Sequence, residues 1–289
     1  MQIPWEFFWR KPSRFPDPDW DAIEELVVAD GLDSAWSEIA LSWMGMIGVA
    51  LGPEYRIHSS KNFLVLSSAP SERLREIVLF LEDCHERILE SLPFVNRSAL
   101  YGKVGVVVFA NDSDFYEYLD LFQESEDGDY GLVGGVYLNS GYGHFAMPSE
   151  KIELYRAVMC HELCHAFLAS FGLPAWLDEA ITQEIEHKIV GGNPYLLDRE
   201  IIRRHRNYWD EERLAAFMTG ESFWFADDGQ ELSYHLARYL FNAMASYSTP
   251  ETMARFIRSV SRDDAGFSAA IEVLDLDLEE VLAGLLDGD

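Results

Sequence analysis

The apolar pattern of the sequence changes near residue 149, and this change limits the fold more than any other feature. Before it, short strand-like runs alternate with amphipathic helices, and Val104 to Phe109 is the clearest buried strand. After it, almost every segment has helical periodicity. Strands first and helices later is an α+β pattern. We therefore expect a small mixed sheet followed by a mostly helical C-terminal half.

The turn and cap signals place the individual elements. In the first half they predict strands at 55–59, 62–68, 104–109 and 131–139. They also predict a helical stretch over 21–51 with a break at Gly31 and a helix over 71–91 capped by Ser71. A short helix that is capped by Asp112 or Ser113 should end at Leu121. In the second half they predict helices over 150–170, 175–190, 197–206, 209–218, 230–246, 250–261, 264–272 and 277–286.

Gly52-Pro53 is a typical boundary signal. It predicts a division between an N-terminal segment, residues 1–52, and a larger domain, residues 53–289. The N-terminal segment begins with an arm rich in Trp and Pro and continues as helix. A chain of 289 residues can bury a substantial core without disulfides.

The chain is strongly acidic, with 22 Lys and Arg against 50 Asp and Glu and a net charge of −28. Nucleic acid and anionic lipid surfaces repel such a chain, so neither is an expected partner. The most apolar stretch, Ile39 to Leu51, is too short to span a bilayer. The N-terminus has no secretory pattern, and three cysteines are too few for a disulfide framework. We therefore expect a cytoplasmic protein.

One short motif carries chemistry: His161-Glu162-Leu163-Cys164-His165. Histidines at positions i and i+4 lie on one helix face, a turn apart, where both can bind one zinc ion. Glu162 then lies beside the metal and can act as a base without being a ligand. The neighbours from Val158 to Phe167 are otherwise uncharged, as a buried metal-binding helix requires.

A catalytic zinc site needs a third protein ligand and an open position. After the turn at Gly172-Leu173-Pro174, the next predicted helix supplies Asp178 and Glu179. An acidic residue in a first helical turn is also favourable for the helix itself. The residues alone leave both carboxylates as candidates.

The segment HELCHAFLASFGLPAWLDEAIT resembles the metal-binding segment of the gluzincin clan of metallopeptidases, the thermolysin-like superfamily, and most of all its small bacterial peptidase MA-like domains. Softer similarity extends over 53–289. The resemblance implies a zinc peptidase acting on a peptide or protein, with His161, His165 and Glu179 as Zn²⁺ ligands. It gives Glu162 the role of general base and then proton shuttle. Ala180 and Cys164 depart mildly from the family pattern.

The resemblance also implies supporting residues. Gluzincins carry an oxyanion donor on a later helix, for which Tyr234 and His235 are the alternatives, since both cannot face the metal. Gln183 lies one turn after Glu179 and could orient a ligand imidazole.

The sequence GLVGGVYLN lies where the family has an edge strand over its active-site helix. Gly134, Gly135 and Val136 would bind an extended peptide there by strand addition. The other histidines are expected to be surface or capped residues rather than ligands: His58, His85, His144, His187 and His205.

Two other functions compete with catalysis. A non-catalytic binding or regulatory protein could use the same scaffold, although it would not need Glu162. A structural zinc protein would need a fourth ligand, for which only Cys160 or Cys164 is near. The substrate, the choice between endo- and exopeptidase and the oligomeric state have no signature in the sequence.

Overall fold

A computed structural model describes residues 13–27, 32–95, 102–122, 134–138, 141–148, 155–191 and 198–287. Its contacts divide the chain into two compact units, residues 1–167 and 168–289. The aromatic residues of the N-terminal arm before residue 13, and Gly31, lie outside the described residues. The boundary predicted at Gly52-Pro53 is a different division and stays a prediction.

The first unit is built on a mixed sheet with the strand order β1-β2-β3-β5-β4. The strands are β1 (Arg56–Ser59), β2 (Phe63–Ser67), β3 (Val104–Phe109), β4 (Val136–Leu138) and β5 (His144–Pro148). β2, β3 and β5 run parallel, while β1 and β4 pair antiparallel at the two edges. The three central strands are buried along their whole length, as expected for strands covered on both faces.

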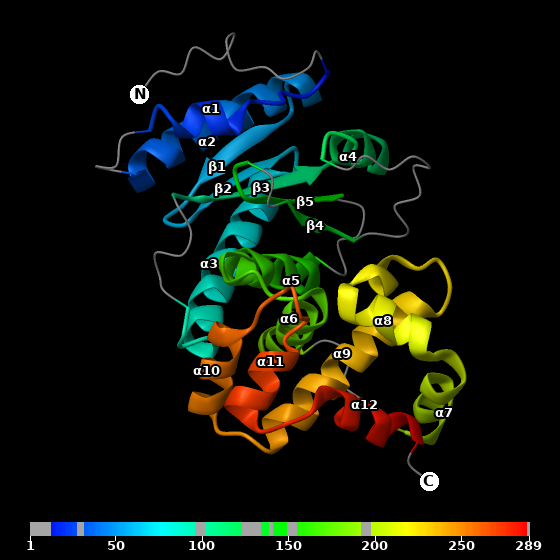
Figure 1. Cartoon of the computed structure of the whole chain (residues 1–289). Helices are drawn as coiled ribbons and strands as arrows, with labels where there is room; N and C mark the ends of the chain where they lie inside the picture. Colours follow the sequence, from blue (N-terminus) through cyan, green and yellow to red (C-terminus); the bar gives the residue numbers. More distant parts are fainter. Residues whose placement is uncertain are drawn as a thin grey trace. The chain divides into compact units, whose positions relative to one another are not determined.

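Helices cover both faces of this sheet (Figure 1). α1 (Trp20–Glu24) and α2 (Leu32–Leu51) lie on one face, and α3 (Ser71–Ser91) and α5 (Tyr155–Leu168) on the other. Successive side chains of a strand point to opposite faces, so Leu64 and Leu66 join the core under α2 while Phe63 contacts His85 of α3. α4 (Asp112–Leu119) follows β3.

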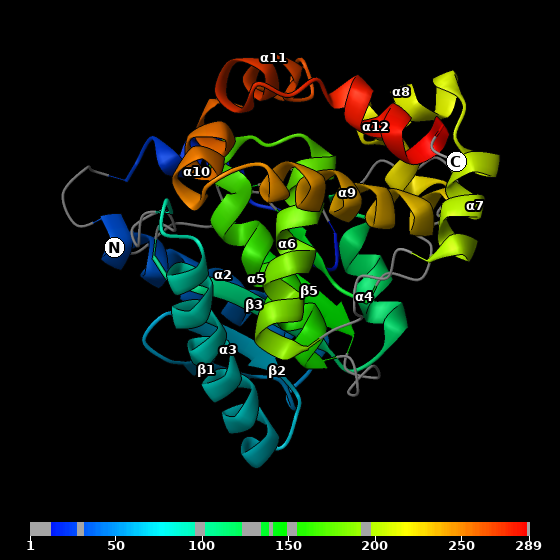
Figure 2. The ribbon, with the colours of Figure 1, turned by 90° about the horizontal axis from the view of Figure 1, so that it is seen from below.

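The second unit is helical. It contains α6 (Ala175–Val190), α7 (Arg199–Tyr208), α8 (Glu211–Thr219), α9 (Gly229–Ser246), α10 (Pro250–Ser259), α11 (Phe267–Ala269) and α12 (Leu278–Asp287). Figure 2 shows α9 crossing α6. An ion pair fixes this crossing, because Arg238 Nε of α9 donates to Glu184 Oε1 of α6 at 2.9 Å with only 9% of the arginine side chain exposed.

The α+β fold with a mostly helical C-terminal half is therefore confirmed. Two predicted caps are wrong. α3 has Pro70 at its N-cap position, with Ser71 already inside the helix. α4 is capped by Asn111, whose side chain accepts the backbone N–H of Asp114 at 2.8 Å, and Asp112 is its first residue. β5 was not predicted at all.

Candidate metal centre

α5 presents the two motif histidines on one face. The ring centroids of His161 and His165 lie 4.7 Å apart, and the ring planes meet at 79°. This distance is expected for side chains one helical turn apart. Both side chains are half-buried. The predicted placement of the pair on one helix face is confirmed.

Most of the side chains that flank this pair on α5 are uncharged and buried. Met159, Cys160, Leu163, Cys164 and Phe167 are each at most 1% exposed. The helix is buried because it packs against its own unit: Phe167 contacts His85 of α3 at 5.1 Å, and Arg156 lies over the ring of Phe80. No other charge competes with the pair from these flanking positions.

Glu162 is also buried, with 6% of its surface exposed. A carboxylate is rarely buried to this extent without a specific role or partner. Since it follows His161 directly, it points about 100° around the helix from that ligand. This position suits a base beside a metal rather than a third ligand.

The start of α6 determines where Glu179 lies. The preceding 3-10 turn (Ala169–Phe171) ends at Gly172, whose φ of 59° and ψ of 40° lie in the left-handed region that favours glycine. Two hydrogen bonds then hold the start of α6: Trp176 Nε1 donates to Ala265 O at 2.9 Å, and Arg262 Nε donates to Leu173 O at 3.1 Å. The carboxylate of Glu179 is therefore carried by a well-anchored helix.

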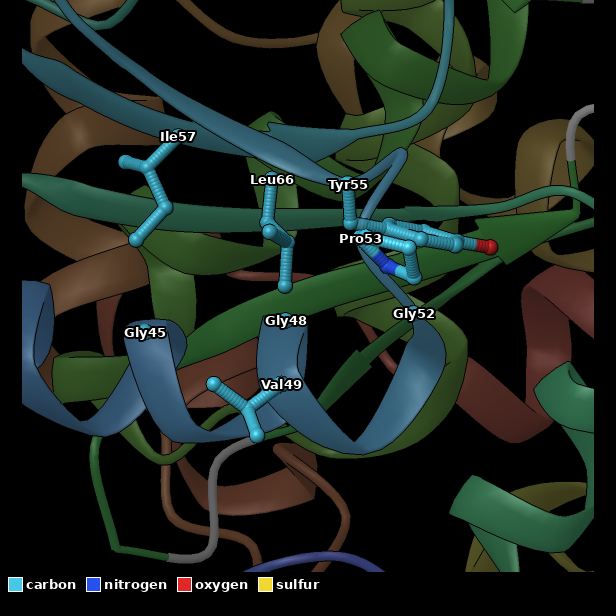
Figure 3. A pocket seen from close by; sticks show the side chains of 8 residues that line it. All are labelled: Gly45, Gly48, Val49, Gly52, Pro53, Tyr55, Ile57 and Leu66. Atoms are coloured by element: carbon cyan, nitrogen blue, oxygen red, sulfur yellow. The ribbon is translucent and has the colours of Figure 1, made fainter.

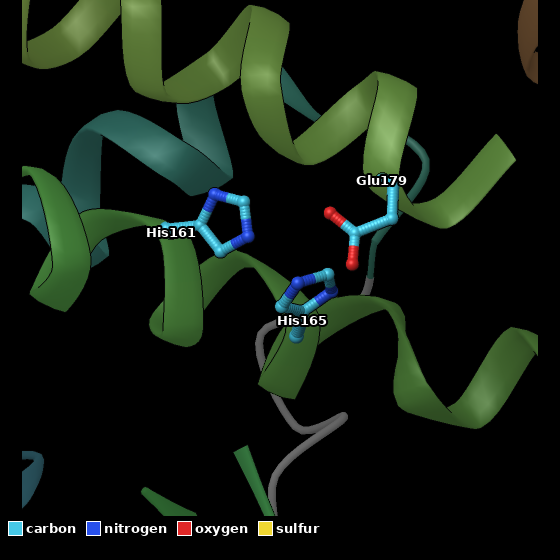
Figure 4. Close-up of side chains that lie close together, drawn as sticks. All are labelled: His161, His165 and Glu179. Carbon is cyan, nitrogen blue, oxygen red and sulfur yellow. The ribbon is translucent and has the colours of Figure 1, made fainter. Parts of the chain in front are cut away.

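His161, His165 and Glu179 form a group of possible metal ligands. One atom from each lies within 4.8 Å of the others, and in the part of the chain that the structure describes no other group of this kind is found (Figure 4). Asp178, the competing carboxylate, is not in the group. Two imidazoles and one carboxylate are a donor set that zinc takes in catalytic sites. The residues present therefore fit this metal.

Gln183 has two hydrogen bonds that the sequence did not predict. Its Nε2 donates to Glu179 O in its own helix and to Tyr234 O in α9, both at 3.2 Å. Gln183 thereby ties the Glu179 turn to the segment that carries the predicted oxyanion donors. The predicted contact with a ligand imidazole stays a prediction.

Tyr234 and His235 are both half-buried on α9. The ring of Tyr234 packs edge-on against Phe223 at 5.2 Å. His235 Nδ1 lies 2.8 Å from His205 Nε2 of α7, and His205 Nδ1 accepts the indole N–H of Trp209 at 2.8 Å. His235 thus has a hydrogen bond to the buried ring of His205, and the ring of Tyr234 packs against Phe223.

The glycines before β4 permit a close approach to α5. A Cβ on Gly135 would lie 2.5 Å from Val158 Cγ1, and one on Gly134 would lie 3.4 Å from Val158 Cγ2. The strand order makes β4 an edge strand of the described sheet, and Val136 pairs with Ala146 on its inner side. The expected edge strand is therefore present beside α5, and the close approach of Gly135 to Val158 serves packing against this helix. Peptide binding at its outer side stays a prediction.

A separate pocket of about 470 Å³ lies between the end of α2 and the first strands (Figure 3). Apart from the Tyr55 hydroxyl, the side chains that line it are apolar: Gly45, Gly48, Val49, Gly52, Pro53, Tyr55, Ile57 and Leu66. Tyr55 Oη already accepts the backbone N–H of Ala110 at 2.7 Å. This pocket lacks an acid, a base or a metal ligand, so it is not a candidate for the chemistry.

Three of the histidines that were expected to be surface or capped residues rather than ligands are buried. His144 and His205 are fully buried and His85 is 8% exposed. His58 is exposed, as predicted. His205 and Trp209 are four residues apart, which places them on one helix face. This spacing could have predicted the contact between their rings.

No family model matches the sequence, and a search of curated proteins gives no match. The resemblance to gluzincins therefore stays a prediction. Among the helices described, none combines the length and the apolar character needed to cross a membrane.

Proposed function

We propose that this chain is a zinc-dependent peptidase of the gluzincin type. The observation that supports this most is the group of His161, His165 and Glu179, whose ligand atoms lie within 4.8 Å of one another. The two histidines share α5 with the buried Glu162. A structural site would need a fourth protein ligand, and the described group has three.

His161, His165 and Glu179 would hold the ion. When bound, zinc supplies a Lewis acid that polarises the scissile carbonyl and makes water easier to deprotonate. Glu162 takes a proton from the attacking water, whose oxygen forms the new bond to the carbonyl carbon. The C–N bond then breaks, and Glu162 gives the proton to the leaving nitrogen. The carboxylate ends as it began, so the step is balanced.

Two further roles complete the proposal. Tyr234 or His235 donates a hydrogen bond to the oxyanion. The outer edge of β4 binds the substrate as an added strand, since an extended peptide can use the backbone groups of an edge.

The replacement Glu162→Gln separates binding from catalysis. We expect the variant to keep its zinc, because Glu162 is not a ligand, and to lose hydrolysis of a fluorogenic peptide library by about 10²–10⁴-fold. Metal content is measured by elemental analysis on the same preparation. Full activity in the variant would rule out this mechanism.

The ligands are tested by His161→Ala and Glu179→Ala, which should each reduce the zinc content of the purified protein. Two matched controls should keep it: His58→Ala removes an exposed imidazole, and Asp178→Asn removes the adjacent carboxylate. Unchanged zinc in both ligand variants would overturn the site. Bound zinc in a chain that cleaves no peptide would favour a non-catalytic binding protein instead.

A further inference from the structure

β1 is the edge of the described sheet opposite to β4. It pairs only with β2, and its four residues make no other backbone hydrogen bond within the described chain. The unpaired N–H and C=O groups of such an edge can pair with another extended chain. β1 can therefore accept an added strand, at the opposite side of the sheet from the edge that the proposed peptidase would use.

The pocket of about 470 Å³ beside β1 gives an added strand a place for its side chains. Ile57 and Leu66 point from the strands toward Gly45 and Gly48 of α2 (Figure 3). A Cβ on Gly45 would meet no atom within 4 Å, so the missing side chain leaves this space open. Val49 follows one turn later and is 85% exposed. Ligand pockets usually have volumes of about 300–1,000 Å³, so this one has room for an apolar side chain.

The two faces of β1 differ in chemistry. Ile57 lines the pocket, so Arg56 and His58 on either side of it point to the opposite face of the sheet. A strand added to β1 would continue this alternation. Its side chains would lie by turns beside the apolar pocket and beside the two basic residues. An alternating apolar and acidic sequence therefore fits this edge.

The cations at this edge are not neutralised by carboxylates of the described chain. Arg56 is exposed and forms no ion pair there. Lys103 Nζ donates to Ser59 Oγ at 2.7 Å and to Ser60 O at 2.6 Å, and neither partner is charged. In a chain with 50 acidic and 22 basic residues, two such cations beside one strand mark a locally basic edge. This edge favours an acidic partner.

A second copy of the chain fits this edge less well than an acidic peptide. A twofold interface uses the same surface on both copies, so it would bring Arg56 and Lys103 of one copy toward those of the other. A short peptide meets chiefly the nearby cations, because exposed charges beyond about 8 Å are largely screened at about 0.15 M ionic strength. Glu54 is the one acidic residue of the segment 53–60, and its carboxylate lies beside Gly52, before the strand begins.

We infer that β1 and the adjacent pocket bind an extended acidic peptide of a partner protein as an added strand. Its apolar side chains would lie against Gly45 and Val49, and its carboxylates would face Arg56 and Lys103. Backbone pairing supplies affinity in such complexes, while pockets for alternate side chains supply specificity. The inference goes beyond the proposed peptidase function and uses none of the residues of that site, so either can fail without the other.

The probe is a short fluorescein-labelled peptide of alternating Leu and Glu, and its binding to the full chain is measured by fluorescence anisotropy. Glu162→Gln is the background, so that hydrolysis at the candidate metal centre does not consume the probe. The alternating peptide should bind at least about tenfold more tightly than two control peptides. One control has Lys in place of Glu, and the other has the same composition with all Leu before all Glu.

The pocket is tested by filling it. Gly45→Leu should weaken binding of the alternating peptide by at least about tenfold, because the new side chain takes the space of the apolar side chain that the peptide would bury. Gly284→Leu is the matched control. It also adds a leucine to a helix at a position with nothing within 4 Å of the new Cβ, and it should leave binding unchanged. Val49→Asp, at an exposed position, is a second variant in case Gly45→Leu prevents folding, and it should also weaken binding.

The charge is tested by Arg56→Glu, which should weaken binding by about three- to tenfold. Arg206→Glu makes the same change in net charge at an exposed position of α7 and should have no effect. Equal affinity in Gly45→Leu, Val49→Asp and Arg56→Glu would overturn the inference, and so would equal binding of the alternating and block peptides. A wild type that sediments as a dimer, and that Gly45→Leu makes monomeric, would also overturn it, because a second copy would then occupy the edge.

Discussion

Burial inside the first unit holds His144 neutral, although its hydrogen bond to the carbonyl of Tyr142 acts in the opposite direction. Its Nδ1 bonds to the carbonyl of Tyr142 and its Nε2 to the hydroxyl of Tyr118, both at 2.7 Å. Since a carbonyl only accepts, Nδ1 carries the proton and Nε2 accepts from Tyr118. Full burial lowers the pKa of His144 to about 4.

This lowered pKa makes stability depend on pH. The unfolded chain protonates His144 near its ordinary value, while the folded chain does not until pH falls to about 4. The contribution is therefore complete above about pH 6.5 and is lost progressively between about pH 6.5 and pH 4. From about pH 7.5 to pH 5.5, the free energy of unfolding should fall by about 1.4 kcal/mol for each such histidine.

The variant His144→Gln should remove this part of the pH dependence. Its amide can donate to Tyr142 O and accept from Tyr118, so the hydrogen bonds are kept without a titrating group. Urea unfolding at the two pH values measures the difference. His58→Gln, at an exposed position, should keep the wild-type slope. An equal slope in His144→Gln would show that this histidine is not held neutral.

Among the elements, the contact between the start of β4 and α5 depends on a missing side chain. A Cβ at Gly135 would lie 2.5 Å from Val158 Cγ1, and Val158 lies one turn before His161. Gly135→Ala should therefore destabilise the protein by about 1–3 kcal/mol, as other overpacked contacts do. Chemical denaturation measures this loss.

Two further variants make the prediction specific. Val158→Ala removes the atom that clashes, so the double variant should recover part of the loss beyond the sum of the single effects. Gly45→Ala, in the interior of α2 with nothing within 4 Å of the added methyl, should instead stabilise by about 0.5–1 kcal/mol. Additive effects of Gly135→Ala and Val158→Ala would argue against the contact.

The elements with regular patterns could be predicted from the sequence. The bounds of α3, β3 and α6 agree with the predicted ranges, because α3 has a clear apolar period, β3 is a continuous apolar run and α6 begins directly after Pro174. β5 could not be found this way: His144–Pro148 contains a histidine and a proline, and it becomes a strand because β3 and β4 pair with it on both sides. The formation of β5 therefore depends on β3, a pairing partner that lies far away in the sequence.

The candidate site shows the same limit. Local spacing was enough to place the two motif histidines together on one helix, whereas the choice of Glu179 over Asp178 came from the family resemblance. His205 and His235 lie on α7 and α9, and their hydrogen bond depends on how those helices pack. His205 looked solitary in the sequence because its histidine partner was thirty residues away.

For the whole molecule, the net charge of −28 complicates any test of metal binding. Divalent cations gather around an acidic surface without a specific site, and salt screens this attraction over about 10 Å at 0.1 M ionic strength. Binding at a half-buried group of two imidazoles and a carboxylate should resist such screening. The salt dependence of stabilisation therefore separates the two modes.

Zinc at about a hundredfold excess over its dissociation constant should raise the free energy of unfolding of the wild type by about 2.7 kcal/mol, because it binds the folded chain. The gain should persist in about 0.15 M NaCl and should be lost in His165→Ala, which removes one of the three ligands. Asp178→Asn lowers the acidic charge by one without touching the group, so it should keep the gain. Stabilisation that disappears with salt, or that is equal in His165→Ala, would mean that zinc binds the acidic surface at large and that the three residues do not form its site.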